Sequence, residues 1–220
     1  MKKSIKVVLT VVCTLALVAG SVLGTLAYLS KNTEVVSNTF VCGKLFDPEE
    51  PKTPQQEDIE DDFYIYETEY TDNGDGTYTP TGELTQEGNE YTVLPGVDIP
   101  KDAKIGTNKN LAIDAFVFIE VKNTLATPLS AEVSSAWTEL KSVTSAHEGF
   151  TVYTLASGAI TAGNILTDTS ILTGDKVTVA DGELPSDPGA IEFYGHIVQA
   201  EGFKNSAADC WSAYVADLAD

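Results

Sequence analysis

Residues 111–122 read LAIDAFVFIEVK, and this stretch decides the fold class. Its apolar residues alternate as side chains do along an extended chain, so Val117 and Val121 share one face. The opposite face carries Phe116 and Phe118. A strand that is apolar on both faces is covered on both sides, which predicts a central strand of a sheet.

Further β-prone segments lie on both sides of this strand. They are Phe63–Tyr70, Tyr91–Leu94, Phe150–Ala156, Ile171–Val179 and Ile191–Gln199. The first is followed by Asn73-Gly74 and Asp75-Gly76, which supply the positive φ values of a tight hairpin. A calcium loop is the alternative, but its twelfth position would be Gly82 instead of a glutamate. The spacing therefore favours a hairpin.

Helical spacing is confined to two short stretches. One lies near the C-terminus, where Ala207, Trp211, Val215 and Leu218 recur on one face. The other is a helical turn expected over Val133–Val143. Short strands, many turn residues and few helices predict a mainly β chain. We expect a jelly-roll-like antiparallel β-sandwich with one or two short helices.

The first 27 residues have the order of a secretory signal peptide. A basic start is followed by the uncharged run Val7–Leu23 and by small residues before a cut between Ala27 and Tyr28. A retained membrane anchor is the alternative, because the run approaches the ~18 to 20 residues that span a bilayer. No basic cluster follows it, which favours cleavage.

The expected mature chain divides into three parts. Residues 28–46 form an extended N-terminal arm, and residues 47–61 form an acidic, proline-rich loop. Residues 62–220 form the β-sandwich domain. This is enough chain for a substantial hydrophobic core.

The charge of the chain is strongly negative. After removal of the signal peptide, 10 lysines and 33 acidic residues remain, which gives a net charge of −23, and the sequence contains no arginine. Such a chain repels nucleic-acid phosphates and anionic lipids. We therefore expect no nucleic-acid partner, and no membrane association after cleavage.

Two cysteines remain in the expected mature chain, Cys42 and Cys210. In an oxidising extracellular environment they can form one disulfide that closes a long loop. The alternative is two free thiols. Two cysteines are too few for a zinc site without histidine partners.

The sequence contains no motif for a known catalytic site. His147-Glu148 begins like a zinc-protease helix, but position 151 is threonine where the second histidine is needed. His196 lies in an apolar strand, where a packed or hydrogen-bonded histidine is the more common case. The acids Asp181, Glu183 and Asp187 favour a solvated loop over a calcium site. We therefore predict no catalytic residue, no cofactor and no metal site.

The N-terminal region resembles the TasA/camelysin family. The resemblance rests on Gly24-Thr25-Leu26-Ala27-Tyr28-Leu29-Ser30, on Glu34-Val35-Val36-Ser37-Asn38-Thr39-Phe40 and on Gly43-Lys44-Leu45. Leu26 and Leu29 replace the aromatic residues usual in that pattern. Members of the family are exported proteins of Gram-positive bacteria that are cut by a signal peptidase of the SipW type.

The resemblance implies a jelly-roll-like sandwich that assembles into fibres of the biofilm matrix. Each subunit would donate its N-terminal strand to a neighbouring copy or to a related matrix protein, at the cell surface or in the extracellular matrix. An extended arm can satisfy its backbone by pairing with an exposed sheet edge. The expected assembly strand contains Thr33, Val35, Val36, Asn38 and Phe40.

Three alternatives remain open from the sequence. The arm can pair within its own domain instead of with a neighbour. The chain can be a camelysin-like secreted metallopeptidase with a site around His147 or His196. It can also be a surface adhesin that binds a host protein or glycan through Tyr64, Tyr66 and Tyr70.

Overall fold

The computed structural model describes residues 45–46, 62–203 and 206–218 of the 220-residue chain. Contacts group Gly43–Asp220 into one unit, which holds every element named below. The expected signal peptide with its cut between Ala27 and Tyr28, the assembly strand and the acidic loop 47–61 lie outside the described residues. These assignments therefore stay predictions.

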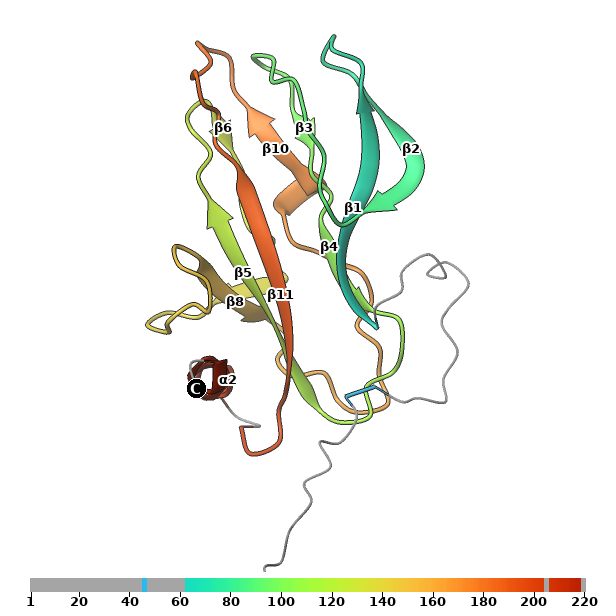
Figure 1. Cartoon of the computed structure of the whole chain (residues 1–220), viewed down its shortest axis with the longest axis vertical. Coiled ribbons are helices and arrows are strands. Elements are labelled where there is room, and N and C mark those ends of the chain that lie inside the picture. Colours follow the sequence, from blue (N-terminus) through green and yellow to red (C-terminus); the bar gives the residue numbers. More distant parts are fainter. Residues whose placement is uncertain (1–44, 47–61, 204–205, 219–220) are drawn as a thin grey trace, which may run out of the picture. The chain divides into compact units, whose positions relative to one another are not determined.

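Antiparallel strands dominate the described part, which confirms the predicted mainly β class. The strands are β1 (Phe63–Asp72), β2 (Tyr78–Thr85), β3 (Ile99–Pro100), β4 (Lys104–Thr107), β5 (Ala115–Asn123), β6 (Leu129–Ser130), β7 (Trp137–Glu139), β8 (Thr151–Leu155), β9 (Thr169–Ser170), β10 (Lys176–Val179) and β11 (Ile191–Gln199). They form three sheets, with the orders β2-β1-β4-β9, β3-β10-β6 and β11-β5-β8-β7 (Figure 1). This arrangement is compatible with the expected jelly roll.

Strand β5 lies inside the third sheet, as its sequence predicts. It pairs with β11 along its whole length and with β8 from Phe118 to Val121. Seven consecutive residues, from Ala115 to Val121, are buried. The strand begins later than expected, because Leu111 instead forms an isolated bridge with Phe46.

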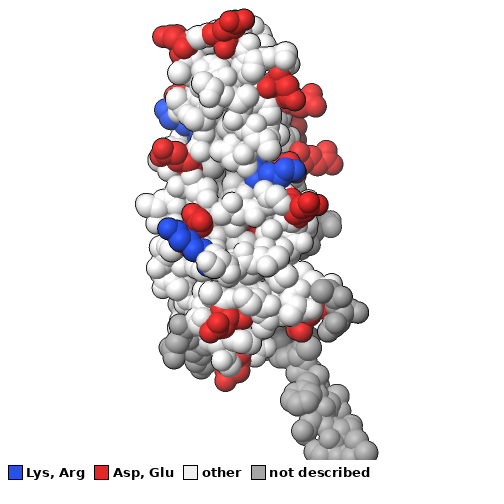
Figure 2. Space-filling model, turned by 90° about the vertical axis from the view of Figure 1, so that its left-hand side faces the viewer, with Lys and Arg blue, Asp and Glu red and all other residues white. Residues whose placement is uncertain are grey.

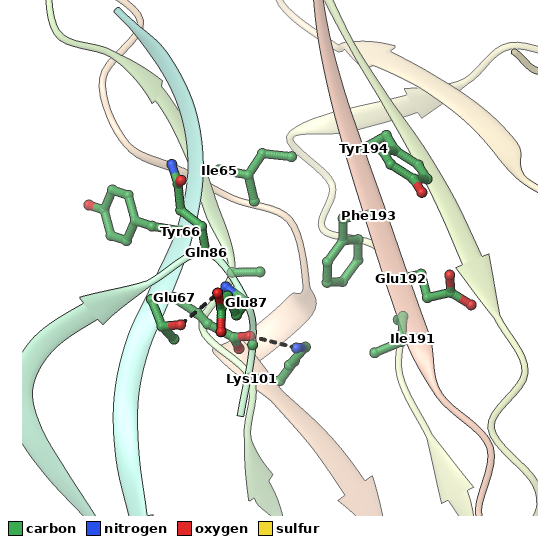
Figure 3. A pocket seen from close by; sticks show the side chains of 13 residues that line it. Ile65, Tyr66, Glu67, Gln86, Glu87, Lys101, Ile191, Glu192, Phe193 and Tyr194 are labelled. Carbon is green, nitrogen blue, oxygen red and sulfur yellow. Dashed lines mark hydrogen bonds and ion pairs between the residues drawn. The ribbon is translucent and has the colours of Figure 1, made fainter. Parts of the chain in front are cut away.

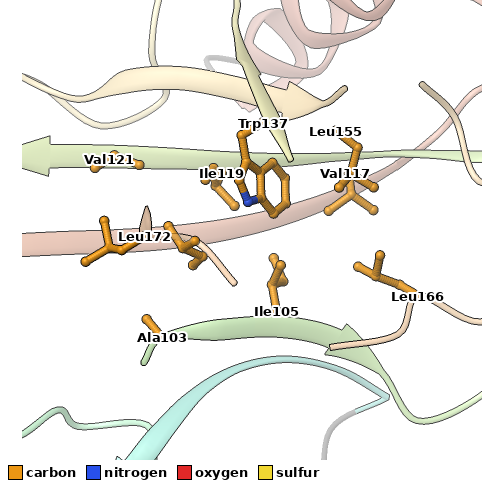
Figure 4. Packing of buried hydrophobic residues seen from close by; sticks show 10 residues of the cluster. Ala103, Ile105, Val117, Ile119, Val121, Trp137, Leu155, Leu166 and Leu172 are labelled. Atoms are coloured by element: carbon orange, nitrogen blue, oxygen red, sulfur yellow. The ribbon is translucent and has the colours of Figure 1, made fainter. Parts of the chain in front are cut away.

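The main core lies between the third sheet and the sheet that contains β1 and β4 (Figure 4). Val117 and Ile119 of β5 face Ile105 of β4, and all three side chains are fully buried. Burying a side chain of this size contributes about 1.5–3 kcal/mol. The odd-numbered residues of β5 therefore hold the two layers together.

The predicted C-terminal helix is confirmed as α2 (Ala207–Leu218). Phe116 and Phe118, on the even-numbered face of β5, pack against this helix. The hydroxyl oxygen of Ser206 accepts a 3.1 Å hydrogen bond from the Asp209 amide, as an N-cap does. The ring of Trp211 packs 5.1 Å from that of Phe118. Within the described residues, no helix has the length and apolar character needed to cross a membrane.

The turn between β1 and β2 is the predicted hairpin. Asp72 pairs with Tyr78 across it. Gly74 and Gly76 have φ values of 76° and 85°, which few residues other than glycine adopt. The Asp72 side chain accepts a 2.7 Å hydrogen bond from the Gly74 amide, so this carboxylate stabilises the turn.

Three local predictions were wrong. Tyr91–Leu94 is irregular, because Tyr91 and Val93 pack against the small β3-β10-β6 core from a loop. The helical turn expected around Trp137 is strand β7, which pairs with β8. The single strand expected over Ile171–Val179 is broken by a 3-10 turn at Thr173–Asp175, where Gly174 has a φ of 70°.

Candidate functional site

Strand β11 is the longest edge strand among the described residues. It has nine residues, and β5 is its one strand neighbour in the described part of the chain. Every second residue of an edge strand directs its amide and carbonyl groups away from the sheet. Another extended segment can therefore add to β11 by backbone hydrogen bonds.

The other edges are less suited to accept a strand. Strands β3, β6, β7 and β9 have only two or three residues each. Strand β2 is longer, but it contains Pro80, and the β1–β2 register shifts between Thr68 and Tyr70. Prolines and bulges protect an edge against further pairing. Strand β11 contains no proline, so its edge lacks that protection.

A groove of about 290 Å³ lies beside β11, between it and β1 (Figure 3). Ile65 of β1 points into the groove from one side, and Ile191 and Phe193 of β11 line the other. Glu87 and Glu192 also line the groove, so it offers both apolar and acidic surface next to the open strand edge.

A partly buried ion pair lies in this groove. The Lys101 ammonium is 2.8 Å from Oε1 of Glu67 and 5.8 Å from the centroid of the Phe193 ring. Oε2 of Glu67 is buried and has no hydrogen-bond partner among the described residues. Leaving a buried acceptor unpaired costs about 1–3 kcal/mol. A donor group entering the groove would be stabilised by pairing with this oxygen.

Acidic side chains outnumber lysines on the molecular face in Figure 2. This agrees with the net charge of −20 for the whole chain. Like-charged molecules repel each other, more strongly at low ionic strength. Contacts between copies of this chain therefore need backbone pairing or apolar burial to offset the repulsion.

A second site lies on the face of the third sheet that α2 covers. There Glu120 of β5, His196 of β11 and His147 of the β7–β8 connection place their ligand atoms within 4.8 Å of one another. In the β5–β11 register, Glu120 is opposite Tyr194, and His196 is opposite Phe118. The sheet therefore presents Glu120 and His196 side by side, and the loop adds the third side chain.

The Glu120 carboxylate is fully buried and accepts four hydrogen bonds. Its Oε1 accepts from the amides of Ala146 at 2.7 Å and His147 at 3.1 Å. Its Oε2 lies 2.6 Å from Nδ1 of His147 and 3.0 Å from Nε2 of His196. Neutral imidazoles that donate to Glu120 carry their hydrogens on these two nitrogens.

The cluster alters the ionisation of two of its members. Burial by itself raises the pKa of Glu120, but the hydrogen bonds from His147 and His196 outweigh it and hold that pKa below the usual value. Burial is the largest influence on His196 and lowers its pKa, against the opposing effect of Glu120. The favoured state is a carboxylate beside a neutral imidazole.

Aromatic side chains fix both imidazole rings. Tyr194 stacks on His147 with 3.8 Å between centroids and 10° between planes. The Tyr214 hydroxyl lies 3.1 Å from Nδ1 of His196. The Trp211 ring packs edge-on against His196 at 5.1 Å. Two oriented imidazoles and a carboxylate are ligand types that zinc accepts.

No family model, curated protein or solved structure matched this chain.

The cysteine pair is only half described. Cys210 is buried on α2 and bonds to no other cysteine within the described residues, and its sulfur lies 3.6 Å from the carbonyl oxygen of Gln199. Cys42 lies outside the described residues, as do Thr33, Val35, Val36, Asn38 and Phe40 of the expected assembly strand. The disulfide therefore stays a prediction.

The tyrosines considered for host binding make internal contacts. The hydroxyls of Tyr64 and Tyr66 both donate hydrogen bonds to Asp168, and their rings lie 5.2 Å apart. Tyr64 is buried, and the Tyr70 amide donates to Asn89. These contacts connect β1 to neighbouring loops, which is what structural residues do.

The acidic loop that was weighed as a calcium site is exposed to solvent. Asp181, Glu183 and Asp187 are all exposed, and Asp187 accepts a 3.0 Å hydrogen bond from the Gly189 amide. None of the three belongs to a cluster of metal-ligand atoms in the described part of the chain. The arrangement fits the favoured solvated loop.

Sequence reasoning did not single out Glu120. The signal that could have found it is a lone carboxylate on the apolar stretch 115–121. A charge in a strand covered on both faces must find partners, because burying it alone is costly. His147 and His196 were the two histidines available to provide them.

Proposed function

We propose that this chain is an exported structural protein that builds an extracellular or cell-surface fibre. The N-terminal arm of one subunit would pair with β11 of the next, or with a related matrix protein. One observation carries the proposal: β11 offers a long edge without proline beside a groove whose lining includes apolar side chains of β1 and β11.

The expected donor strand fits such an acceptor chemically. Val35, Val36 and Phe40 are apolar or β-branched, and an extended donor points alternate side chains to opposite faces. One row would enter the groove, and the other would face solvent. Backbone hydrogen bonds would supply affinity, while the groove would select the donor register.

The resemblance to the TasA/camelysin family supports the same proposal. It suggests a jelly-roll subunit, cleavage by a SipW-type peptidase and delivery to the biofilm matrix. Removal of residues 1–27 would free the arm, so assembly would follow export. The proposed role is structural and does not require catalysis.

Assembly of the chain beginning at Tyr28 tests the proposal. We expect light scattering to rise with time and negative-stain microscopy to show regular fibres. Deleting residues 28–41 should abolish fibres and leave the sandwich folded, because the deletion ends before the unit that begins at Gly43. A synthetic peptide of residues 28–41 should inhibit growth, whereas a scrambled peptide should not.

Hydrogen exchange identifies the acceptor. In fibres, the outward amides of β11 should exchange more slowly than in the arm-deleted monomer, while those of β2 should not change. Fibres that form without residues 28–41 would rule out strand donation. A stable monomer whose arm deletion lowers the free energy of unfolding would instead indicate pairing within one subunit.

A further inference from the structure

Strand β5 buries a carboxylate at a position where an apolar residue would serve the core. Glu120 has no exposed surface, and it lies on the same face as Phe116 and Phe118. Removing a carboxylate from water is expensive unless several partners surround it. Its hydrogen bonds meet this cost, but they do not explain why two histidines converge on one oxygen.

The convergence is asymmetric in a way that suits a metal ligand. Oε1 of Glu120 is held by the backbone amides of Ala146 and His147. Oε2 faces the two imidazole nitrogens. In metal sites, outer contacts of this kind orient a ligand and leave its other atom for the ion.

The imidazoles have matching supports. Nδ1 of His196 faces the Tyr214 hydroxyl, which can accept the hydrogen that this nitrogen carries when Nε2 binds an ion. The His147 ring is stacked on Tyr194, which fixes its plane. All three candidate ligands thus have a second contact that positions them.

The distances are close to those of a bound ion. Ligand atoms held at about 2.0 Å from a tetrahedral ion lie about 3.3 Å apart. The nitrogens of His147 and His196 lie 2.6 Å and 3.0 Å from Oε2 of Glu120. All three ligand atoms lie within 4.8 Å of one another, so shifts on the order of 1 Å would bring them to the spacing of a tetrahedral site. His147 can make this shift, since it lies outside the sheet strands and its side chain is 41% exposed.

We propose that Glu120, His147 and His196 form a binding site for one divalent transition-metal ion, represented by Zn²⁺. Imidazole and carboxylate ligands favour such ions over calcium, which prefers oxygen ligands. Three protein ligands leave a fourth position of a tetrahedral ion for water. The exposed side of His147 gives the ion a route from solvent.

The bound ion would join β5 and β11 to the loop that carries His147. Because the ion would bind the folded chain and not the unfolded one, it would stabilise the sandwich in proportion to its concentration. This inference is independent of strand donation, since a single subunit holds the whole site.

Calorimetric titration tests the proposal, using protein from Tyr28 onward without a histidine tag and stripped with a chelator. We expect Zn²⁺ to bind at one ion per chain and to raise Tm. His147→Ala should weaken binding at least tenfold. The exposed neighbour change Glu148→Gln serves as the matched control and should leave the affinity unchanged.

Tyr214→Phe separates a ligand site from adventitious binding. It removes the hydroxyl that faces His196 but leaves all three ligands, so we expect a loss of affinity of about tenfold. Absence of Zn²⁺ binding, or equal affinity in the parent and His147→Ala, overturns the proposal. The Tm of each metal-free variant shows whether the fold is intact, so a loss of binding can be assigned to the site.

Discussion

The indole nitrogen of Trp211 donates a 2.7 Å hydrogen bond to the main-chain carbonyl of Thr144. This contact joins α2 to the loop that carries His147. The Trp211 ring is fully buried between Phe118 and His196, so one side chain connects helix, sheet and loop. The C-terminal helix is thereby part of the sandwich and not an appendage.

Trp211→Phe should lower the free energy of unfolding by about 1–3 kcal/mol, because it keeps an aromatic ring but removes the hydrogen bond to Thr144. Urea unfolding measures the change. Hydrogen exchange should also show faster opening of the amides of Ala146 and His147. Ser212→Ala on the exposed side of the same helix should change stability by less than about 0.5 kcal/mol. Equal effects of the two substitutions would contradict the assigned role of Trp211.

Cys210 should react slowly with thiol reagents while the protein is folded. Burial raises the pKa of its thiol from 9.0 to about 11, so little thiolate exists at neutral pH. Labelling of Cys210 at pH 7.5 should be slow in buffer and fast in denaturant. Rapid labelling of Cys210 in the folded protein would contradict this. In denaturant without reductant, absence of labelling would instead reveal the predicted disulfide with Cys42.

The same thiol should make stability fall at alkaline pH. The folded chain holds the Cys210 proton more tightly than the unfolded chain, so this contribution is complete below about pH 9.0 and is lost as pH rises towards about 11. Burial also raises the pKa of Tyr153. Comparison with Cys210→Ala therefore isolates the thiol, and the variant should lose less stability over this pH range. Parallel pH profiles would contradict the assignment.

Gly189→Ala should be strongly destabilising. A Cβ at this position would lie 2.1 Å from the carbonyl oxygen of Thr124, and the backbone has a φ of 75°. We expect a loss of more than about 3 kcal/mol by thermal unfolding. Gly163→Ala is the matched control, since its φ is 81° but no atom lies within 4 Å of the added Cβ. It should cost about 1–2 kcal/mol, the strain of the conformation alone.

Gly195 allows β11 to approach the opposite sheet closely. A Cβ there would meet Cδ1 of Ile105 at 2.8 Å and Cδ1 of Ile65 at 2.9 Å. Gly195→Ala should cost about 1–3 kcal/mol by overpacking. Adding Ile105→Val removes one of the clashing methyl groups, so the double variant should lose less than the sum of the single changes. Additive losses in urea unfolding would show that this contact is not limiting.

Features that depend on neighbouring residues could be predicted from the sequence. The alternation around Phe116–Phe118 gave a strand covered on both faces, and Asn73–Gly76 gave the hairpin turn. The spacing of Ala207 and Trp211 gave the C-terminal helix. Backbone sterics and side-chain periodicity are local properties, so they can be recognised in the sequence without knowledge of the fold.

Local pattern failed where distant packing overrides propensity. Tyr91 contacts Tyr78 edge-on, with ring centroids 5.2 Å apart, and its segment stays irregular. The segment around Trp137 was expected to form a helical turn, but Trp137 pairs with Leu155 in a strand. Its indole nitrogen donates a hydrogen bond to the Ser170 carbonyl. Both residues are placed by partners that their own surroundings do not reveal.

The sequence by itself determined that this chain is acidic, mainly β and has a helix near its C-terminus, because charge and side-chain periodicity depend only on the order of the residues. Only the tertiary structure decided that β11 lies at an open edge, since an edge is defined by the order of strands in a sheet. It also decided the meeting of Glu120 with His147 and His196, which are 27 and 76 positions away along the chain. Such encounters depend on how the strands pair and where the loops return, and no local pattern encodes them.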